Sequence, residues 1–374
     1  MFCLRQEGCS SFLKAKKRLL KRITGIVVFF VLLWEGNYML SGLYVPKDNS
    51  SGIIKEFYQQ KKDTVDVLFF GSSHSYRSIM PMELWKDAGI SAMNLGTSSQ
   101  PFVATYYLMK DSLRRQSPKV VVLELYGSQY EEDYGAGNIS LFQSAVNFIP
   151  LNLTKLELWW NQIRKDFSWK EQVEFLFPLT GFHMRWDVLT DTDYFYSAAY
   201  LQGGHPSEKL EKQVPGKVVT ECKDLNETTE KYLKKMIDLC EKKQVPLIVF
   251  AAPMAAEFDR YENSCARINA ACEYAEKRGV TVFRMSEVAE SMDLDHTEDF
   301  YNSSHLNLFG ALKLTKWFET YLTGHYEFQD HRKDPRYHNW EDALPRYEET
   351  VRQKRESLEK QKAGAEVSIE NDEL

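Results

Sequence analysis

The chain has 374 residues, of which 43% are hydrophobic and 27% charged, the balance of a globular protein with a filled core. Its net charge of −6 at pH 7 gives no reason to expect nucleic acid as a partner. The six cysteines include no Cys-x-x-Cys pair and no zinc-like spacing with histidine. We therefore expect no metal site and no cofactor, and the sequence leaves the disulfide state of the cysteines open.

The first 45 residues carry the pattern of a membrane signal anchor. A basic cluster within residues 1–22 is followed by the uncharged stretch Ile23–Trp34, and the apolar character continues to Val45. Residues 23–45 are long enough to cross a bilayer, which takes roughly 20 residues. Lysine and arginine before the span predict a cytoplasmic N-terminus and an extracytoplasmic domain. A cleaved signal peptide is the alternative, but no Ala-x-Ala-like cleavage site follows the apolar stretch.

Residues 63–326 alternate between apolar strands and helices. Continuous apolar strands separated by helices predict an α/β fold with a parallel sheet covered by helices on both faces. In such sheets, functional groups gather at the carboxyl ends of the strands. The expected strands are residues 65–70, 91–95, 119–125, 247–251 and 280–284, and the expected helices are residues 101–115, 228–243, 265–278 and 307–322.

Three further segments interrupt or flank this pattern. Residues 46–62 read as a polar spacer, and residues 130–220 as an aromatic-rich helical insertion folded over the sheet. Those aromatic side chains either stack on sugar rings or simply form core, and core is the more common role. Residues 327–374 form a charged extension, for which we expect a helix over residues 340–362 and a disordered end.

The first chemical signal follows the first strand, in Gly71-Ser72-Ser73-His74. A serine where a strand turns into a helix has an exposed hydroxyl close to helix N-terminal amides, which stabilise an oxyanion. Taken alone the signal is weak, because Gly-Ser-Ser is common in ordinary turns.

The second signal lies between the last strand and the last helix, in the segment Asp299–Asn307, which contains His305. With this segment the chain resembles the SGNH (GDSL-type) hydrolases. In that family the nucleophilic serine follows the first strand in a Gly-[Asp/Ser]-Ser block, and the base comes from an Asp-x-x-His block before the final helix. The resemblance implies a flavodoxin-like three-layer fold, Ser73 as nucleophile and His305 as general base.

The implied chemistry is acyl transfer through a Ser73 acyl-enzyme, ending on water or on another hydroxyl. One departure concerns the residue that orients His305. Asn302 stands where the family has aspartate, and an amide orients an imidazole without stabilising its charged form. Asp299 is the alternative, with Asp293 and Asp295 weaker ones.

Two other blocks of the family also differ. The oxyanion loop matches residues 94–100, where Ser99 takes the place of the family glycine and Gly96 offers another flexible point. The asparagine expected after the third strand is missing, and Tyr126, Ser128 and Gln129 are substitutes that the sequence does not rank.

Three more residues are candidates for substrate contact. His74, beside the nucleophile, is either a second proton carrier, a substrate contact or a structural histidine. His183 and Arg185 lie in a segment that resembles one in bacterial membrane-anchored members of the group, and they are candidate substrate contacts.

The anchor and the domain together resemble bacterial proteins that act beside membrane-bound O-acyltransferases, such as DltD and the alginate O-acetylation proteins. By that analogy the chain moves an acyl group, typically acetyl, onto or off a cell-surface polysaccharide. One alternative is a catalytically weak SGNH-like protein that binds glycan or a membrane-bound O-acyltransferase partner. The other is an unrelated flavodoxin-like ligand-binding module.

Overall fold

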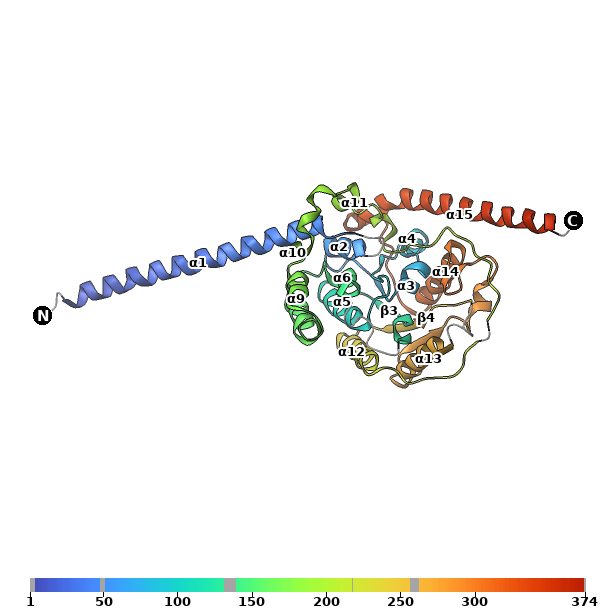
Figure 1. Cartoon of the computed structure of the whole chain (residues 1–374), viewed down its shortest axis with the longest axis horizontal. Coiled ribbons are helices and arrows are strands. Elements are labelled where there is room, and N and C mark those ends of the chain that lie inside the picture. Colours follow the sequence, from blue (N-terminus) through green and yellow to red (C-terminus); the bar gives the residue numbers. More distant parts are fainter. Residues whose placement is uncertain (1–3, 48–50, 131–138, 217, 256–261, 373–374) are drawn as a thin grey trace.

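A five-stranded parallel sheet in the order β2-β1-β3-β4-β5 lies at the centre of the domain (Figure 1). The computed structural model describes residues 4–47, 51–130, 139–216, 218–255 and 262–372. The strand order is that of the flavodoxin-like doubly wound folds, which confirms the predicted fold class. The strands are β1 (Val67–Phe70), β2 (Ala92–Asn94), β3 (Val120–Glu124), β4 (Leu247–Ala251) and β5 (Thr281–Arg284).

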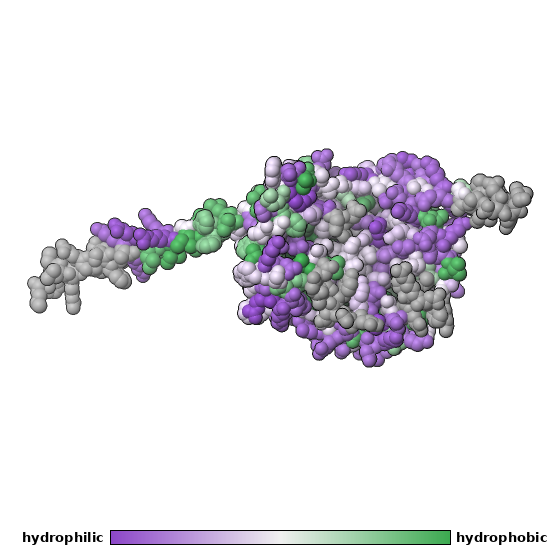
Figure 2. Space-filling model, in the orientation of Figure 1, coloured by the Kyte–Doolittle hydropathy of each residue, from purple (hydrophilic) through white to green (hydrophobic). Residues whose placement is uncertain are grey.

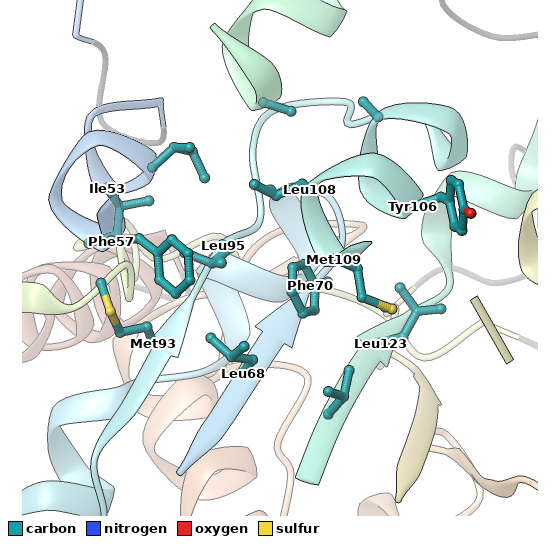
Figure 3. Close-up of a cluster of buried hydrophobic side chains, with 14 of the residues drawn as sticks. Ile53, Phe57, Leu68, Phe70, Met93, Leu95, Tyr106, Leu108, Met109 and Leu123 are labelled. Atoms are coloured by element: carbon teal, nitrogen blue, oxygen red, sulfur yellow. The ribbon is translucent and has the colours of Figure 1, made fainter. Parts of the chain in front are cut away.

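Every residue of β1, β2 and β3 is buried, because helices cover both faces of the sheet. Side chains alternate between the faces, so Leu68 and Phe70 join one core cluster while Val67 and Phe69 join the other. Figure 3 shows part of the first cluster. The helices of the α/β unit are α3 (Ser73–Ser78), α4 (Pro81–Ala88), α5 (Phe102–Arg115), α12 (Glu227–Lys243), α13 (Glu262–Lys277) and α14 (Leu308–His325).

A short antiparallel hairpin connects the sheet to its last helix. Strands β6 (Phe300–Asn302) and β7 (His305–Leu306) pair so that Asn302 lies opposite His305. Asn307 then caps α14, since its side chain accepts hydrogen bonds from the amides of Phe309 and Gly310. The hairpin and its cap fix the position of His305 relative to the sheet.

The segment expected to be a polar spacer contains a packed helix. Helix α2 (Ser51–Gln59) buries Ile53, Ile54 and Phe57 in the first core cluster. The expectation failed because the apolar residues of this helix are only a few, and their partners come from distant parts of the chain.

The C-terminal extension is more helical than expected. After the short turn η6 (Pro335–Tyr337), helix α15 runs over His338–Asp372, so it continues through most of the end predicted to be disordered. Its first half is tied to the domain by buried Trp340 and Tyr347, and the Tyr347 hydroxyl donates to Glu83 at 2.6 Å.

Helix α1 (Leu4–Tyr44) projects from the domain as a single rod (Figure 1). Within its segment Lys16–Tyr44, a stretch of 18 residues has a mean hydropathy of 1.7, and none of that stretch is buried. Within the described residues it is the one helix long and apolar enough to cross a membrane. The helix extends well beyond the predicted span, because the basic cluster before it is helical too.

The aromatic-rich insertion is largely helical up to Leu201, but residues 202–216 and 218–220 form no helix; residues 131–138 and 217 lie outside the described ranges. Some of its aromatic side chains are core and others are not: Phe167, Phe175 and Tyr196 are buried, whereas Trp169 and Phe195 are exposed. Its elements are α6 (Ile139–Val146), α7 (Leu153–Leu158), η2 (Trp159–Ile163), α8 (Arg164–Asp166), α9 (Trp169–Leu176), α10 (Leu179–Phe182), η3 (His183–Asp187), α11 (Asp191–Tyr194) and η4 (Ala199–Leu201), preceded by η1 (Tyr126–Gln129).

The cysteines that the structure describes in the domain, Cys222, Cys240, Cys265 and Cys272, do not form disulfides.

Candidate active site

Ser73 is the first residue of α3, directly after a tight turn that leaves β1. Gly71 in this turn has φ +146°, and a Cβ placed there would lie 2.6 Å from Cβ of Glu124. Only glycine fits this approach. Ser72 caps α3, and its hydroxyl accepts from the His74 amide at 3.2 Å. The amide of Ser73 itself stands at the first helical position, where no intrahelical acceptor exists.

The structure brings Ser73 and His305 together, although 232 residues separate them in the sequence. Ser73 Oγ lies 2.8 Å from Nε2 of His305. The other ring nitrogen, Nδ1, is 3.2 Å from Oδ1 of Asn302 and 3.0 Å from Oγ of Ser304. With the proton on Nδ1 donated to Asn302, Nε2 is free to accept the Ser73 hydroxyl, which is the arrangement of a nucleophile and its base.

Asn302 is itself held in one orientation. Its Oδ1 accepts from the amides of Ser304 and His305, each at 2.9 Å. This local turn aims the oxygen at the imidazole. The sequence had left the choice between Asn302 and Asp299 open, and the geometry favours Asn302.

Asp299 does not contact His305. Its buried carboxylate accepts from Nζ of Lys313 at 2.8 Å and from the amide of Asp295 at 2.6 Å. The two weaker candidates do not orient His305 either. The Asp295 carboxylate accepts a hydrogen bond from the Thr297 amide, and Asp293 lies at the end of the turn η5 (Ala289–Met292). These groups stabilise the base of the hairpin rather than the imidazole.

The electrostatic surroundings keep His305 neutral. Burial, and then the positive charge of Arg77, lower the pKa of His305 to about 4. Arg77 is fixed nearby, because it donates to the carbonyl of His205 at 2.9 Å and lies over the ring of Tyr301 at 5.7 Å. A neutral imidazole is ready to accept a proton, but with Asn302 as partner no carboxylate stabilises the charged form.

The His74 ring packs against His305. It stacks on Tyr126, with centroids 3.5 Å apart, and on His305, with centroids 4.1 Å apart. Burial, followed by the nearby His305, lowers the pKa of His74 well below its usual value. The ring is therefore neutral, and its contacts fit the structural role better than that of a second proton carrier.

Glu124, which the sequence analysis did not single out, holds the turn Gly71–Ser73 through hydrogen bonds to Ser72. Its carboxyl accepts from the Ser72 hydroxyl at 2.8 Å, from the Ser72 amide at 3.0 Å and from the Tyr126 amide. Burial raises the pKa of Glu124 to about 7, although these hydrogen bonds oppose the shift. The available signal was an acidic residue in an otherwise apolar buried strand, where a charge needs partners.

The loop that follows β2 packs against the nucleophile turn. The Gly96 amide donates to Oδ1 of Asn94 at 3.0 Å, so it is already occupied. The Thr97 amide donates to the carbonyl of Gly71 at 3.3 Å. Ser99 has φ +48°, the left-handed conformation that favours glycine. The backbone thus keeps the glycine conformation at the position where the family has that residue.

The other sequence candidates lie elsewhere or serve the scaffold. His183 is exposed and bonds to the carbonyl of Thr180 at 2.9 Å, and Arg185 pairs with Asp193 beside the end of α1. Neither has a contact with Ser73 or His305. Ser128 donates to the carbonyl of Leu125, which leaves Tyr126 as the residue after β3 that reaches the site.

Within the described ranges no group of three or more His, Cys, Asp or Glu side chains is arranged to hold a metal ion.

Comparison with known proteins gives structural likeness only. No family model and no curated protein matches the chain. Among solved structures it is similar to a GDSL-like lipase from Bacteroides thetaiotaomicron, at 10% identity and a TM-score of 0.37, covering 74% of this chain and 98% of the other. It is also similar to a protein assigned as an acylhydrolase from Bacteroides fragilis, at 11% identity and a TM-score of 0.38, covering 75% and 99%.

A mutant form of the esterase AlinE4 is a further similar structure, with 12% identity, a TM-score of 0.28 and coverage of 71% of this chain and 98% of that one. At these scores the likeness carries no argument about activity, which depends on the site geometry.

Proposed function

We propose that the chain is a serine esterase or O-acyltransferase whose nucleophile is Ser73 and whose general base is His305. The observation that carries the proposal is the 2.8 Å approach of Ser73 Oγ to His305 Nε2, with Nδ1 facing Asn302 Oδ1. A chance approach would not also place the serine at a helix N-terminus after a strained glycine turn. A flavodoxin-like module that only binds a ligand has no need of this pair.

In the proposed reaction, His305 Nε2 takes the Ser73 proton while Oγ attacks the carbonyl carbon of an ester. The oxyanion that forms lies near the Ser73 amide at the start of α3, where helix N-terminal donors stabilise negative charge. Nε2 then returns the proton to the departing alcohol, leaving the acyl group on Ser73. Water or a sugar hydroxyl then attacks this acyl-enzyme while His305 Nε2 takes its proton. The acyl–Oγ bond breaks, and Nε2 returns the proton to Ser73 Oγ, which restores the enzyme.

The identity of residue 302 determines how well His305 acts as a base in this proposal. Asn302 fixes the tautomer and the ring orientation, but it supplies no negative charge for the imidazolium. In serine proteases the exchange of aspartate for asparagine costs roughly 10⁴ in kcat, largely because the tautomer is wrong. Here the amide oxygen, held by two backbone amides, faces Nδ1, so the correct tautomer is retained and the loss is smaller.

The proposed setting is the outer surface of a cell membrane, with α1 as the anchor and the basic cluster on the cytoplasmic side. The proposed substrates are acyl esters, typically acetyl, of a surface polysaccharide, with a membrane-bound O-acyltransferase as the proposed partner. The support for this setting is the apolar segment Lys16–Tyr44 and the resemblance of the two sequence blocks.

The second candidate function is a catalytically weak protein that binds glycan or such a partner. The observation that favours it is the low pKa of His305, about 4, next to an amide instead of a carboxylate. A base of this kind is a weak proton acceptor in the ground state.

The two candidates are distinguished with the full chain purified in detergent and a chromogenic acetyl ester. We expect turnover that Ser73→Ala lowers by about 10³-fold or more in kcat, because the acyl-enzyme cannot form. Ser140→Ala, an exposed serine of α6, is the matched control and keeps full activity. A fluorophosphonate should add its phosphonyl group to Ser73, as read by peptide mass spectrometry. Equal turnover by wild type and Ser73→Ala, with no labelling at Ser73, would contradict the proposal.

A further inference from the structure

Residues 177–195 of the insertion, which we call the collar, pack around the point where α1 enters the domain. The amide of Leu179 donates to the hydroxyl of Ser41 at 3.2 Å. Nη1 of Arg185 donates to the carbonyl of Tyr44, the last residue of α1, at 2.5 Å. The end of α1 and the collar therefore form one packed unit instead of a domain hanging from a loose tether.

Two charged groups of the collar, Arg185 and Asp193, pair with each other against the end of α1, whereas Asp187 and Asp191 are exposed. Arg185 pairs with both carboxylate oxygens of Asp193, at 3.0 and 3.1 Å, and Asp193 also accepts from the Thr190 amide at 2.9 Å. Lys47, just after α1, donates to the carbonyl of Asp193 at 2.5 Å. Asp193, the centre of this polar cluster, is 3% exposed.

Several large apolar side chains of the collar are exposed, while Leu179, Phe182 and Leu189 are half-buried. A cluster of exposed apolar side chains marks an interaction surface. Figure 2 shows apolar atoms gathered where α1 joins the domain. The exposed members and their relative exposures are Met184 (68%), Trp186 (66%), Val188 (57%), Tyr194 (53%) and Phe195 (77%).

The position of the collar along α1 indicates which part of the membrane it would contact. A span of about 20 residues from Ile23, the first residue after the basic cluster, crosses a hydrocarbon core and ends near Gly42. The collar contacts α1 at Ser41 and Tyr44, at that level. A cavity of about 470 Å³ lies between α1 and the insertion, and Trp34 and Tyr194 both line it, so the collar also reaches toward the span.

We propose that the collar is a membrane-docking surface, whose exposed aromatic and aliphatic side chains enter the lipid headgroup region around α1. Tryptophan and tyrosine suit this region because they combine an apolar ring with one polar group. The domain then lies against the bilayer at a fixed height. This inference rests on α1 crossing the membrane, and it is independent of catalysis at Ser73.

The test uses the full chain in phosphatidylcholine nanodiscs, with one nitroxide spin label per variant. The background carries Cys3→Ser, Cys9→Ser and Cys222→Ser, which leaves the buried cysteines 240, 265 and 272. Labels at Trp186→Cys and Phe195→Cys probe the collar. A label at Leu32→Cys, 67% exposed on α1, reports the span, and a label at Val214→Cys, 83% exposed on a distant loop, is the aqueous control.

Power-saturation measurements compare the accessibility of each label to oxygen, which is enriched in lipid, and to a water-soluble nickel chelate. We expect the ratio of oxygen to nickel accessibility at residues 186 and 195 to exceed that at residue 214 by about threefold or more, approaching that at residue 32. Apart from the scaffold protein at their rim, the nanodiscs contain no second protein, so a collar covered only by a protein partner would give the aqueous ratio of residue 214 and overturn the proposal. An aqueous ratio at residue 32 would overturn the membrane span and the docking surface together, while esterase activity and its loss in Ser73→Ala would still decide the catalytic proposal.

Discussion

The edge of the sheet that carries Ser73 and the collar around α1 are built in opposite ways. At the sheet edge, polar groups such as Glu124 and His74 are buried, and each is held by neighbours that fix its orientation. In the collar the polar cluster around Asp193 is also satisfied, but several large apolar side chains of the same segment are exposed. Burial of polar groups tunes their chemistry, whereas exposure of apolar groups prepares a surface for a different solvent.

The largest effect that tests this contrast is the loss of the base. His305→Ala should lower kcat on the acetyl ester by about 10³-fold or more, since Ser73 then has no group to accept its proton. The thermal unfolding midpoint, measured by circular dichroism, should change far less than for a core substitution. His325→Ala, an exposed histidine at the end of α14, serves as the control. Comparable turnover in His305→Ala and wild type would remove His305 from the mechanism.

A smaller effect is expected at Glu124, beneath the site. Glu124→Gln preserves the shape of the side chain but leaves one acceptor oxygen where two accept three hydrogen bonds. We expect a loss of about 1–3 kcal/mol in the free energy of unfolding, because a buried donor loses its partner.

Denaturant unfolding of the full chain in detergent measures this loss. Glu241→Gln, on the surface of α12, should change the same free energy by less than about 0.5 kcal/mol. If both variants unfolded alike, Glu124 would not be a support of the nucleophile turn.

Asn302→Asp is expected to raise activity. A carboxylate keeps the hydrogen bonds from the Ser304 and His305 amides and adds a negative charge 3.2 Å from Nδ1. The charge stabilises the imidazolium, so kcat on the acetyl ester should rise by about tenfold, or about 1.4 kcal/mol in activation free energy.

The same variant has a pH signature. In the wild type His305 accepts protons only in its neutral form, so kcat/KM should hold down to about pH 4 and fall below it. The added carboxylate raises the pKa of His305 and therefore moves this fall to higher pH. A pH profile with the same acid limb in both proteins would show that residue 302 does not act on His305.

The smallest expected effect is in the collar. Replacing exposed Trp186 and Phe195 by serine should change the free energy of unfolding in detergent by less than about 0.5 kcal/mol each, since exposed side chains contribute little to the fold. Thermal or denaturant unfolding checks this, with Phe175→Ser, a fully buried change, as the destabilising comparison. A large loss in the exposed variants would mean that these side chains pack on the domain, contrary to the contrast drawn above.

The parts of the fold that follow from local pattern were predictable from the sequence. Strand Leu247–Ala251 was placed to the residue, and the ends of the other four strands lie within two residues of the predicted ones. The pairing of Ser73 with His305 was predictable because both lie in motifs at opposite ends of the α/β pattern. These features depend on hydrophobic period and turn chemistry, which are written locally.

The features that escaped prediction depend on contacts between distant segments. Helix α2 is stable only because its apolar face meets the core, and Glu124 is explained only by the Ser72 turn that lies over it. In the sequence Asp299 and Asn302 are both candidates for orienting His305, but the Asp299 carboxylate is bound to Lys313. Sequence spacing does not reveal which of two neighbouring acceptors faces a given ring.

The direct junction between α1 and the domain has a mechanical consequence. Because Tyr44, Ser41 and Val45 are held by the domain, rotation of the helix axis carries the whole domain with it. Transmembrane helices adjust their tilt to bilayer thickness. If α1 spans a membrane as proposed, a thicker or thinner bilayer would change the angle at which Ser73 faces that membrane, and lipid composition would then affect access to the proposed site.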